Sequence, residues 1–439
     1  MNIVLIVVDT LRASRLGCYG YEKPTSPAMD RLAAEGIQFA RCIAPGIPTT
    51  PAHTTIYTGQ HPLTHNIVTH GGQVDLDRKT PVLPELLQQA GYTTAAVDNL
   101  VTIKPWFARG YEFYIDPSYR HRYRLLVSCE EINARAIPWL RAYAHEKFFL
   151  FLHYWDPHTP YTPPEKYCTF YPPDRDPFSP EHTSLAPIRR QPIWGMFNDI
   201  WFSRLGPVTD AEYIASLYDA QIRHVDDGIA ELLAALDAMG LSENTLVVLT
   251  GDHGESLYQH DIYFDHHGLY DDVIHVPLIL RCPTVIPAGQ RFWPMVQHLD
   301  LAPTILEAAG VPVPAGMEGK SLWPVATGKT NTGGWERVIC CESTWQSKWA
   351  VRTDTAKFIL AREPDRHNMP MRELYDLTTD PGETHNLAIE RWEEAEDLEA
   401  ALERWIAEGL ARVGRTEDPL RVQGITLGKR WDHWRAARS

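Results

Sequence analysis

Short apolar runs alternate along this chain with longer stretches of helical periodicity. The helical stretches cover residues 26–36, 80–91 and about 210–240, and a glycine closes each of them. The apolar runs are rich in β-branched and aromatic residues, and they span residues 3–8, 93–98, 148–153, 245–250 and 276–281. This alternation predicts an α/β fold: a mostly parallel, buried central sheet with helices on its faces.

Two breaks in the pattern divide the chain. Residues 160–207 are rich in proline and aromatic residues and lack clear periodicity, which is typical of an ordered insertion at the wall of a site. Near residue 330 the pattern changes to short strand-like runs followed by one helix over about 391–412. We therefore predict a catalytic domain over 1–330 and a smaller C-terminal domain over 331–439, with an antiparallel sheet and a covering helix. The basic tail at 428–439 is either a frayed end or an arm for a homo-oligomer.

Polar side chains follow the predicted strands, at the sheet edge where α/β proteins bind their ligands. They are Asp9, Asp98, Asn99, His153, Asp156, His158, Asp252 and His253. One aspartate after a strand is commonly a turn former or a helix cap. Ligand-type residues after four strands indicate a site instead.

Asp9, Asp252 and His253 supply two carboxylates and an imidazole, which suit one divalent metal ion. The sequence does not distinguish Mn, Ca, Mg or Zn. His260, His266 and His267 add histidines close to this set. A second metal ion remains open, with Asp265, His266, His260 and Asp156 as its candidate ligands.

The segment 45–62 has the pattern of a loop that enters a helix. Pro51 is expected at the first helical position, with Thr50 as the N-cap. A helix N-terminus binds anions, and Thr49 and His53 are not explained by the cap. These two residues are therefore candidates for contact with a phosphate or sulfate group.

Composition narrows the function classes. The chain has 439 residues, with 41 Lys+Arg against 56 Asp+Glu and a net charge of −15, which argues against a nucleic-acid scaffold or an anionic membrane as partner. Its seven cysteines include no C-x-x-C pair, so we expect reduced thiols and a cytoplasmic location. No apolar run is long enough for a membrane span.

Several segments, in order, resemble the sulfatase family of the alkaline phosphatase superfamily. They are VLIVVDTLRASRLGCYGY, HYWDPHTPYTPP, TLVVLTGDHGES with HHGLYDDVIHVPLIL, HLDLAPTILEAAG with GKSLWP, and ELYDLTTDPGETHNL. The resemblance covers nearly the whole chain. It implies a large α/β domain with a smaller C-terminal one, a metal ion at the strand ends, and hydrolysis of an anionic ester through a covalent intermediate.

The chain departs from the family pattern at three positions. Where sulfatases have C-x-P-x-R, or serine first, and convert that first residue to formylglycine, this chain reads Thr49-Thr50-Pro51-Ala52-His53. No formylglycine is therefore expected. Thr10 stands where family members have a second aspartate, and His53 stands at the arginine position. A threonine nucleophile resembles the phosphoryl-transfer branches of the superfamily, such as nucleotide pyrophosphatase/phosphodiesterases and lipoteichoic acid synthases.

The resemblance implies roles for these residues. Thr49 is the expected nucleophile and a metal ligand together with Asp9, Asp252 and His253, and Thr50 remains its alternative. His53, His158 and His267 are expected to act on the anion or the leaving group. The remaining candidates for substrate contact are Asn99, Asp156 and His266.

Three functions remain open at this point. The leading hypothesis is a metal-dependent phosphodiester or phosphonate monoester hydrolase in which Thr49 forms a phosphoenzyme. The alternative is a sulfuric ester hydrolase that acts without formylglycine. The second alternative is a non-catalytic binding protein on the same fold. Each of the three has a small anionic ester as its partner.

Overall fold

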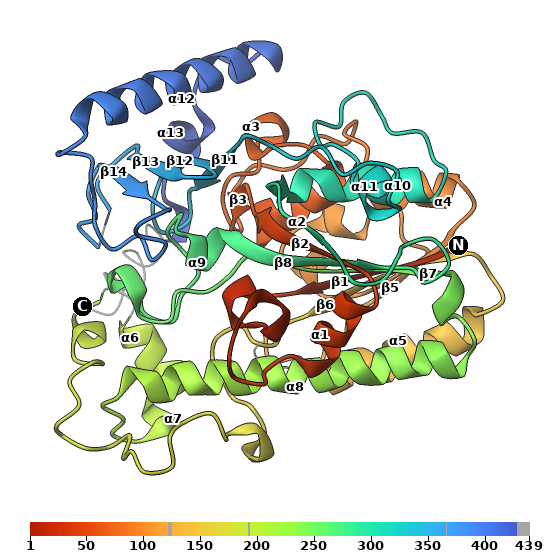
Figure 1. Cartoon of the computed structure of the whole chain (residues 1–439), viewed down its shortest axis with the longest axis horizontal. Helices are drawn as coiled ribbons and strands as arrows, with labels where there is room; N and C mark the ends of the chain where they lie inside the picture. Colours follow the sequence, from red (N-terminus) through yellow and green to blue (C-terminus); the bar gives the residue numbers. More distant parts are fainter. Residues whose placement is uncertain (122–124, 192–193, 366, 428–439) are drawn as a thin grey trace.

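The computed structural model describes residues 1–121, 125–191, 194–365 and 367–427, and the basic tail at 428–439 lies outside them. A nine-stranded sheet forms the centre of the molecule, in the order β10-β2-β8-β7-β1-β6-β4-β5, with β9 paired to β2 (Figure 1). Its strands are β1 Asn2–Val8, β2 Ile37–Ile43, β4 Thr93–Val97, β5 Phe113–Ile115, β6 Phe148–Tyr154, β7 Thr245–Gly251, β8 His275–Arg281, β9 Gln290–Phe292 and β10 Val296–Gln297.

The five apolar runs predicted as strands are confirmed as β1, β4, β6, β7 and β8. β1 lies at the centre and pairs in parallel with β6 and β7, and all its residues are buried. Such burial on both faces explains why these strands read as continuous apolar runs without alternation. β8 runs antiparallel to β7 and β2, so the sheet is mixed but mostly parallel.

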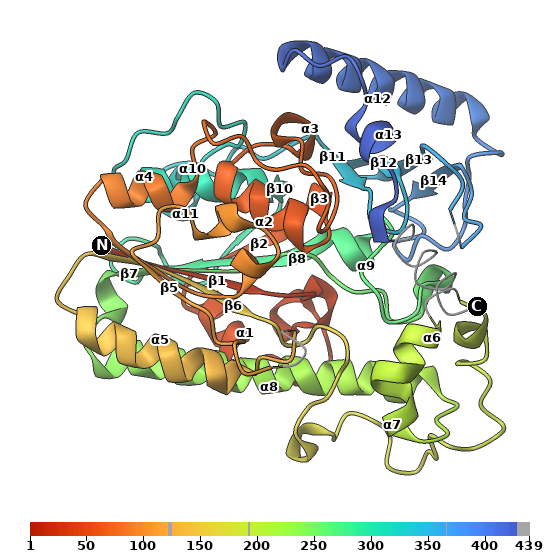
Figure 2. The same cartoon turned by 180° about the vertical axis from the view of Figure 1, so that it is seen from behind.

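Helices cover both faces of the large sheet. Figure 1 and Figure 2 show α1, α5 and α8 on one face and α2, α4, α10 and α11 on the other. Their bounds are α1 Pro27–Ala34, α2 Thr49–Thr58, α4 Leu83–Gln89, α5 Cys129–Tyr143, α8 Ala211–Ala238, α10 Leu301–Ala308 and α11 Trp323–Ala326. Short helices complete the described chain: α3 Pro62–His65, α6 Trp194–Phe197, α7 Ser203–Leu205, α9 Asp271–Ile274 and α13 Pro419–Gln423.

A second sheet has five strands in the order β14-β13-β12-β11-β3. They are β3 Gly46–Ile47, β11 Arg337–Glu342, β12 Lys348–Thr353, β13 Ala356–Ala361 and β14 Arg372–Asp376, and α12 Trp392–Arg412 packs over β12, β13 and β14. The antiparallel strands and the helix follow the sequence prediction. The parallel pairing of β3 with β11 was not expected, and it carries the start of α2 against the C-terminal sheet. Gly46 permits the close approach of α3 to this strand, because a Cβ there would lie 2.4 Å from the Pro62 side chain.

Several aromatic side chains of the insertion at 160–207 pack inward. Tyr161 and Trp201 are buried with their ring centroids 4.9 Å apart, and Phe264 lies against both. These rings therefore form core rather than an open stacking surface. In the part of the chain that the structure describes, no helix has both the length and the apolar content needed to cross a membrane.

Candidate active site at the strand ends

Helix α2 begins at Thr49, two residues earlier than predicted. Pro48 is the N-cap, so the prediction of Thr50 as the capping residue is wrong. The Thr50 hydroxyl instead lies 3.1 Å from Nδ1 of His70. Pro51 is tolerated in the first turn because the amides there have no intrahelical acceptor. The early start places Thr49 at the N-terminus of a helix in which every side chain is buried.

Thr49 meets the predicted metal ligands at this point. Its Oγ1 lies 3.4 Å from Nε2 of His253. The same His253 nitrogen lies 3.3 Å from Oδ2 of Asp252 and 3.9 Å from Oδ1 of Asp9. Asp9 follows β1 and Asp252 follows β7, two paired neighbours, so their parallel register brings the carboxylates together. The sequence prediction therefore placed all four residues in one cluster.

Two oxygens in this cluster have no donor. Among the described residues, Asp9 Oδ1 and Asp252 Oδ2 are buried and lack a hydrogen-bond partner. Asp252 Oδ1, in contrast, accepts from the backbone N–H groups of Thr10 and His253. An unpaired buried carboxylate oxygen is costly unless a cation balances it. The donor set Asp9, Asp252 and His253, whose ligand atoms all lie within 4.8 Å of one another, fits a divalent metal ion.

Thr10 contributes through its backbone. Its φ of 54° is uncommon for a β-branched residue and turns the N–H toward Asp252, with an N to Oδ1 distance of 3.1 Å. The threonine that replaces the family's second aspartate therefore fixes the orientation of Asp252. This role had no signal in the sequence.

His153 links two carboxylates behind the cluster. Its Nε2 lies 3.2 Å from Oδ2 of Asp9 and its Nδ1 lies 2.9 Å from Oδ1 of Asp98. Burial lowers the pKa of His153, but the hydrogen bonds to Asp9 and Asp98 outweigh it and raise the pKa to about 10. The protonated ring therefore orients the Asp9 carboxylate, a role that the sequence did not assign. Asn99 is buried next to Asp98, directly after β4.

His53 lies on the other side of Asp252, with 3.5 Å between its Nε2 and Oδ2 of Asp252. Burial lowers the pKa of His53, so its ring is neutral. His53, His153 and Asp252 form a second group whose ligand atoms lie within 4.8 Å of one another. His53 thus faces the cluster as predicted for the residue at the arginine position.

A row of histidines extends from the cluster. The ring centroid of His266 lies 4.8 Å from that of His253 and 4.9 Å from that of His158. Burial lowers the pKa of His266, but Glu255 and Asp265 outweigh it and raise the pKa to about 10. Burial lowers the pKa of His158. The row therefore combines a positively charged ring with a neutral one, which can bind an anion and exchange a proton.

Comparison with known proteins identifies this arrangement. The family model described as "Sulfatase" matches residues 1–311. The chain belongs to the sulfatase family. A second model, described as "N-sulphoglucosamine sulphohydrolase, C-terminal", matches residues 259–410. The family members of known activity hydrolyse anionic esters, so the chain is a sulfatase-family ester hydrolase.

Three relatives illustrate the likeness. An N-acetylglucosamine-6-O-sulfatase of Bacteroides thetaiotaomicron is 26% identical, with 88% of this chain and 82% of the relative covered. A solved structure of a protein in complex with its substrate D-glucosamine-2-N,6-O-disulfate has a TM-score of 0.75 at 23% identity, covering 94% and 98%. The phosphonate monoester hydrolase of Agrobacterium radiobacter has a TM-score of 0.73 at 21% identity, covering 94% and 96%. The two structures share the fold of this sulfatase-family chain.

The C-terminal region of this sulfatase-family chain supplies a residue that the sequence missed. Nε2 of His267 lies 2.9 Å from Nε2 of His367, in the loop between β13 and β14. Asp265 lies behind His267, with 3.5 Å between Oδ2 and Nδ1. His367 and His70 are single histidines far from the other motifs, so only the fold brings them here.

The ligands predicted for a second metal ion do not come together. His260 has a φ of 55° and stacks on Tyr270, with 3.6 Å between ring centroids. Asp265 contacts His266 and His267, whereas Asp156 contacts Cys129 at the start of α5 and Gln221 in the middle of α8. The four candidates that the sequence left open for a second metal ion therefore share no common site, because the loop after Asp252 turns His260 onto the tyrosine ring.

Asp156, which the sequence proposed as a substrate contact, accepts hydrogen bonds from the protein itself. Its Oδ2 accepts from the backbone N–H of Cys129 at 3.0 Å, and its Oδ1 accepts from Nε2 of Gln221 at 3.0 Å. Both donors therefore lie in helices, Cys129 in α5 and Gln221 in α8, and the carboxylate stabilises the N-terminus of α5.

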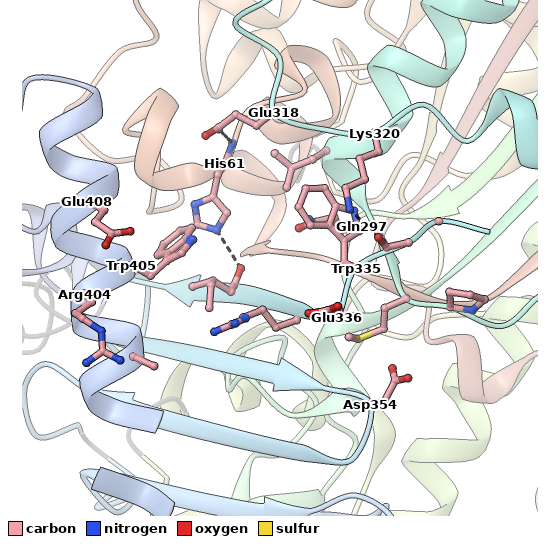
Figure 3. Close-up of a pocket in the computed structure, with 18 of the residues that line it drawn as sticks. His61, Gln297, Glu318, Lys320, Trp335, Glu336, Asp354, Arg404, Trp405 and Glu408 are labelled. Atoms are coloured by element: carbon pink, nitrogen blue, oxygen red, sulfur yellow. Dashed lines mark hydrogen bonds between the residues drawn. The ribbon is translucent and has the colours of Figure 1, made fainter. Parts of the chain in front are cut away.

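A large cavity lies elsewhere, between α12 and the 294–337 segment, with a volume of about 1080 Å³ (Figure 3). Trp405 and Arg404 project into it from α12, and Nζ of Lys320 lies 4.0 Å from the ring centroid of Trp335. Its described lining residues include none of the strand-end cluster. This cavity is therefore separate from the candidate active site at the strand ends.

Proposed function

We propose that this chain hydrolyses a phosphodiester or a phosphonate monoester, with Thr49 as the nucleophile. The observation that carries the proposal is the contact of 3.4 Å between Thr49 Oγ1 and His253 Nε2, beside two buried carboxylate oxygens without donors. A hydroxyl among residues that fit a divalent metal ion has the position required of an activated nucleophile.

Asp9, Asp252 and His253 would hold the metal ion, with Thr49 beside them. A bound divalent cation supplies a lowered hydroxyl pKa and neutralises negative charge on the ester oxygens. The chain itself would bind the anionic group of the substrate and supply the proton for the leaving group.

The anionic group of the substrate is expected at the start of α2. The first amides of a helix have no intrahelical acceptor, and the helix dipole adds positive potential there. The protonated ring of His266 provides further positive charge along the histidine row. Together these groups stabilise the negative charge that develops as Thr49 attacks.

The leaving group needs a proton. His158 and His267 are the candidate donors, because each is buried within the histidine row or next to it. Nδ1 of His158 is engaged with the Thr159 carbonyl at 2.6 Å, which fixes the orientation of the ring. With Nδ1 donating to the carbonyl, the neutral ring has its lone pair at Nε2, so His158 accepts a proton there before it can pass one to the leaving group.

The choice of phosphorus rests on the chemistry of threonine. A formylglycine hydrate releases sulfate by collapse to its aldehyde, and a threonine ester has no such exit. Water must then attack the bound group itself. This requirement is what favours phosphorus over sulfur in the proposal.

A sulfate ester is the second candidate, and the comparisons favour it over the phosphorus ester. The curated relatives with a named activity are sulfatases, among them the N-acetylglucosamine-6-O-sulfatase of Bacteroides thetaiotaomicron. Phosphonate monoester hydrolases occur among the structural neighbours, so the fold accommodates both classes. Under this second proposal Thr49 attacks sulfur and the leaving alcohol comes from a sulfated sugar.

Rates on three p-nitrophenyl esters test the proposal: the sulfate, the phenylphosphonate and bis-p-nitrophenyl phosphate. We expect the wild type to cleave the phosphorus esters much faster than the sulfate, and Thr49→Ala to lose all three activities with its metal ion retained. A preference for the sulfate would overturn the first candidate and support the second. No turnover on any ester with metal bound would support a binding protein instead.

The cellular location and the partner of this chain are proposals as well. We propose a cytoplasmic location and a small anionic ester as partner, from the cysteine pattern and the charge. We leave the oligomeric state open, and the ligand set does not distinguish Mn, Ca, Mg and Zn.

A further inference from the structure

A second group of ligand-type side chains lies away from the strand-end cluster. Cys129 begins α5, His224 is in α8, and Asp156 follows β6. All three are buried, and their ligand atoms lie within 4.8 Å of one another. α5 and α8 pack side by side on the face of the sheet opposite to α2 (Figure 2). The group therefore joins three elements of the helical layer and is separate from the proposed active site.

One buried ring nitrogen of His224 has no hydrogen-bond partner among the described residues. Its Nε2 lies 2.7 Å from Oε1 of Glu130 and donates to that carboxylate. This leaves Nδ1 with a lone pair, and among the described residues Nδ1 is buried without a hydrogen-bond partner. The side chain is only 4% exposed, so water does not readily reach it. An imidazole with a carboxylate on one nitrogen and a buried lone pair on the other has the arrangement of metal-ligating histidines.

The other two side chains face the same point. Oδ1 of Asp156 lies 3.9 Å from Nδ1 of His224. That separation is close to the roughly 3.5 Å expected for two ligands of one tetrahedral zinc ion at about 2.1 Å each. Sγ of Cys129 makes only long contacts of 3.6 Å, to Oε2 of Glu130 and to the His224 carbonyl. The thiol is therefore not committed to a strong hydrogen bond.

We propose that Cys129, Asp156 and His224 form a zinc-type structural site, with Glu130 as the partner that orients His224. One sulfur, one nitrogen and one oxygen donor suit Zn²⁺ or Co²⁺, whereas Mg²⁺ and Ca²⁺ prefer oxygen ligands alone. Bound metal would tie the start of α5 to α8 and to the loop after β6. The site adds stability to the helical layer and takes no part in the ester chemistry.

Metal binding there releases one proton. A cysteine binds zinc as the thiolate, so the thiol loses its proton when the metal ion binds. The step is Zn²⁺ plus Cys–SH giving a zinc–thiolate bond and H⁺, with no change of oxidation state. The affinity of the site should accordingly rise with pH.

Cobalt and zinc binding test the site in the full-length chain. An Asp252→Asn background removes a ligand from the strand-end cluster, so the metal that remains reports on the second site. With Co²⁺ we expect a thiolate-to-cobalt charge-transfer band in the near ultraviolet, and with Zn²⁺ about one tightly bound ion per chain. Cys129→Ser in that background should lose both. Cys168→Ser, which removes an exposed thiol of the insertion, should keep both.

Glu130→Gln keeps the test decisive if Cys129→Ser fails to fold. Glu130 is 60% exposed, so the substitution is expected to leave the fold intact. Loss of an outer partner weakens metal affinity by about 10–100-fold, and we expect a shift of that size in a zinc titration. The proposal is overturned if no charge-transfer band forms with the Asp252→Asn protein, if Cys129→Ser retains the band, or if Glu130→Gln binds Zn²⁺ as tightly as its parent.

Discussion

Thr49 Oγ1 lies 3.4 Å from Nε2 of His253, although 204 positions separate the two residues. The contact exists because α2 starts at Thr49, where β3 meets the C-terminal sheet, and because β7 ends just before Asp252 and His253. Two independent pieces of backbone therefore meet at one hydroxyl. The predictions below follow from this meeting point and from the side chains that support it.

Thr49 and Thr50 should behave differently when substituted. Thr49→Ala is expected to lower kcat by at least about a thousandfold, since a nucleophile is removed, and Thr49→Ser should restore part of the rate. Thr50→Ala should cost less than about tenfold, because its hydroxyl is engaged with His70. Steady-state rates with equal metal content measure the difference. A larger loss in Thr50→Ala than in Thr49→Ala would reassign the nucleophile.

Metal binding should raise thermal stability, because Asp9 Oδ1 and Asp252 Oδ2 are buried without donors. At a free concentration of 100 times Kd, Mn²⁺ or Mg²⁺ is expected to add about 2.7 kcal/mol. Scanning calorimetry with and without chelator measures the change in Tm. Asp252→Asn is the matched variant and should lose the metal-dependent shift. An unchanged Tm in the wild type would contradict a metal ion at this cluster.

Asp98 is expected to affect metal affinity and kcat/KM without contacting the substrate. It holds Nδ1 of His153, whose Nε2 holds Asp9, so Asp98→Asn is expected to weaken metal affinity and kcat/KM by about 10–100-fold. Tyr114→Phe is the control, since it removes a hydroxyl that donates to Asp98 and leaves the carboxylate in place. Metal titrations of both variants check the role. Equal affinity in Asp98→Asn and wild type would show that His153 does not depend on this partner.

His367 should affect substrate binding more than chemistry. It reaches His267 from the C-terminal region at 2.9 Å, away from the Thr49 hydroxyl. We expect His367→Ala to raise KM by about threefold to tenfold with a smaller change in kcat. His385→Ala replaces an exposed histidine of the same region and should leave both constants unchanged. If kcat falls and KM stays constant, the C-terminal region acts in the chemical step instead.

Asp300 should make the free energy of unfolding depend on pH, independently of the candidate active site. Its carboxylate is buried and accepts from the N–H groups of Gln297 and Lys320, and burial raises its pKa to about 6. A carboxyl group with a raised folded-state pKa stabilises the protein fully below its unfolded pKa of 3.8, and this contribution is lost as the pH rises through about 6. The wild type should therefore lose stability relative to Asp300→Asn between about pH 4 and pH 7, by on the order of 3 kcal/mol.

Urea unfolding at several pH values measures that difference. Asp300→Asn is expected to be less stable throughout, because its amide places a donor against backbone N–H groups. The difference in the free energy of unfolding between the wild type and Asp300→Asn should become smaller as the pH rises. Asp77→Asn, at an exposed position, is the control and should show a constant gap. A gap for Asp300→Asn that stays constant or widens with pH would contradict the raised pKa.

The sequence predicted the parts of the fold that depend on local pattern. The five apolar runs became buried strands because each is apolar on both faces, and Asp9 and Asp252 met because β1 and β7 are parallel neighbours. The helix over 391–412 was also recovered, since its apolar positions repeat over many turns.

The parts that failed depend on contacts distant in sequence. Thr50 does not cap α2, because β3 pairs with β11 and moves the helix start to Thr49. Asp156 accepts hydrogen bonds from Cys129 and Gln221, and the spacing of these residues in the sequence does not indicate these contacts. His70 and His367 joined the site as single histidines, without a motif around either. Tertiary pairing decided each of these positions.

The most direct test of the central claim is to locate the covalent intermediate. The enzyme is mixed with a fast-leaving aryl phosphonate or aryl sulfate, quenched in acid and mapped by peptide mass spectrometry. We expect the transferred group on Thr49 in the wild type and no transferred group on Thr49→Ala. A burst of p-nitrophenol without any modified peptide, or a group attached to Thr50 or to another residue, would contradict Thr49 as the nucleophile.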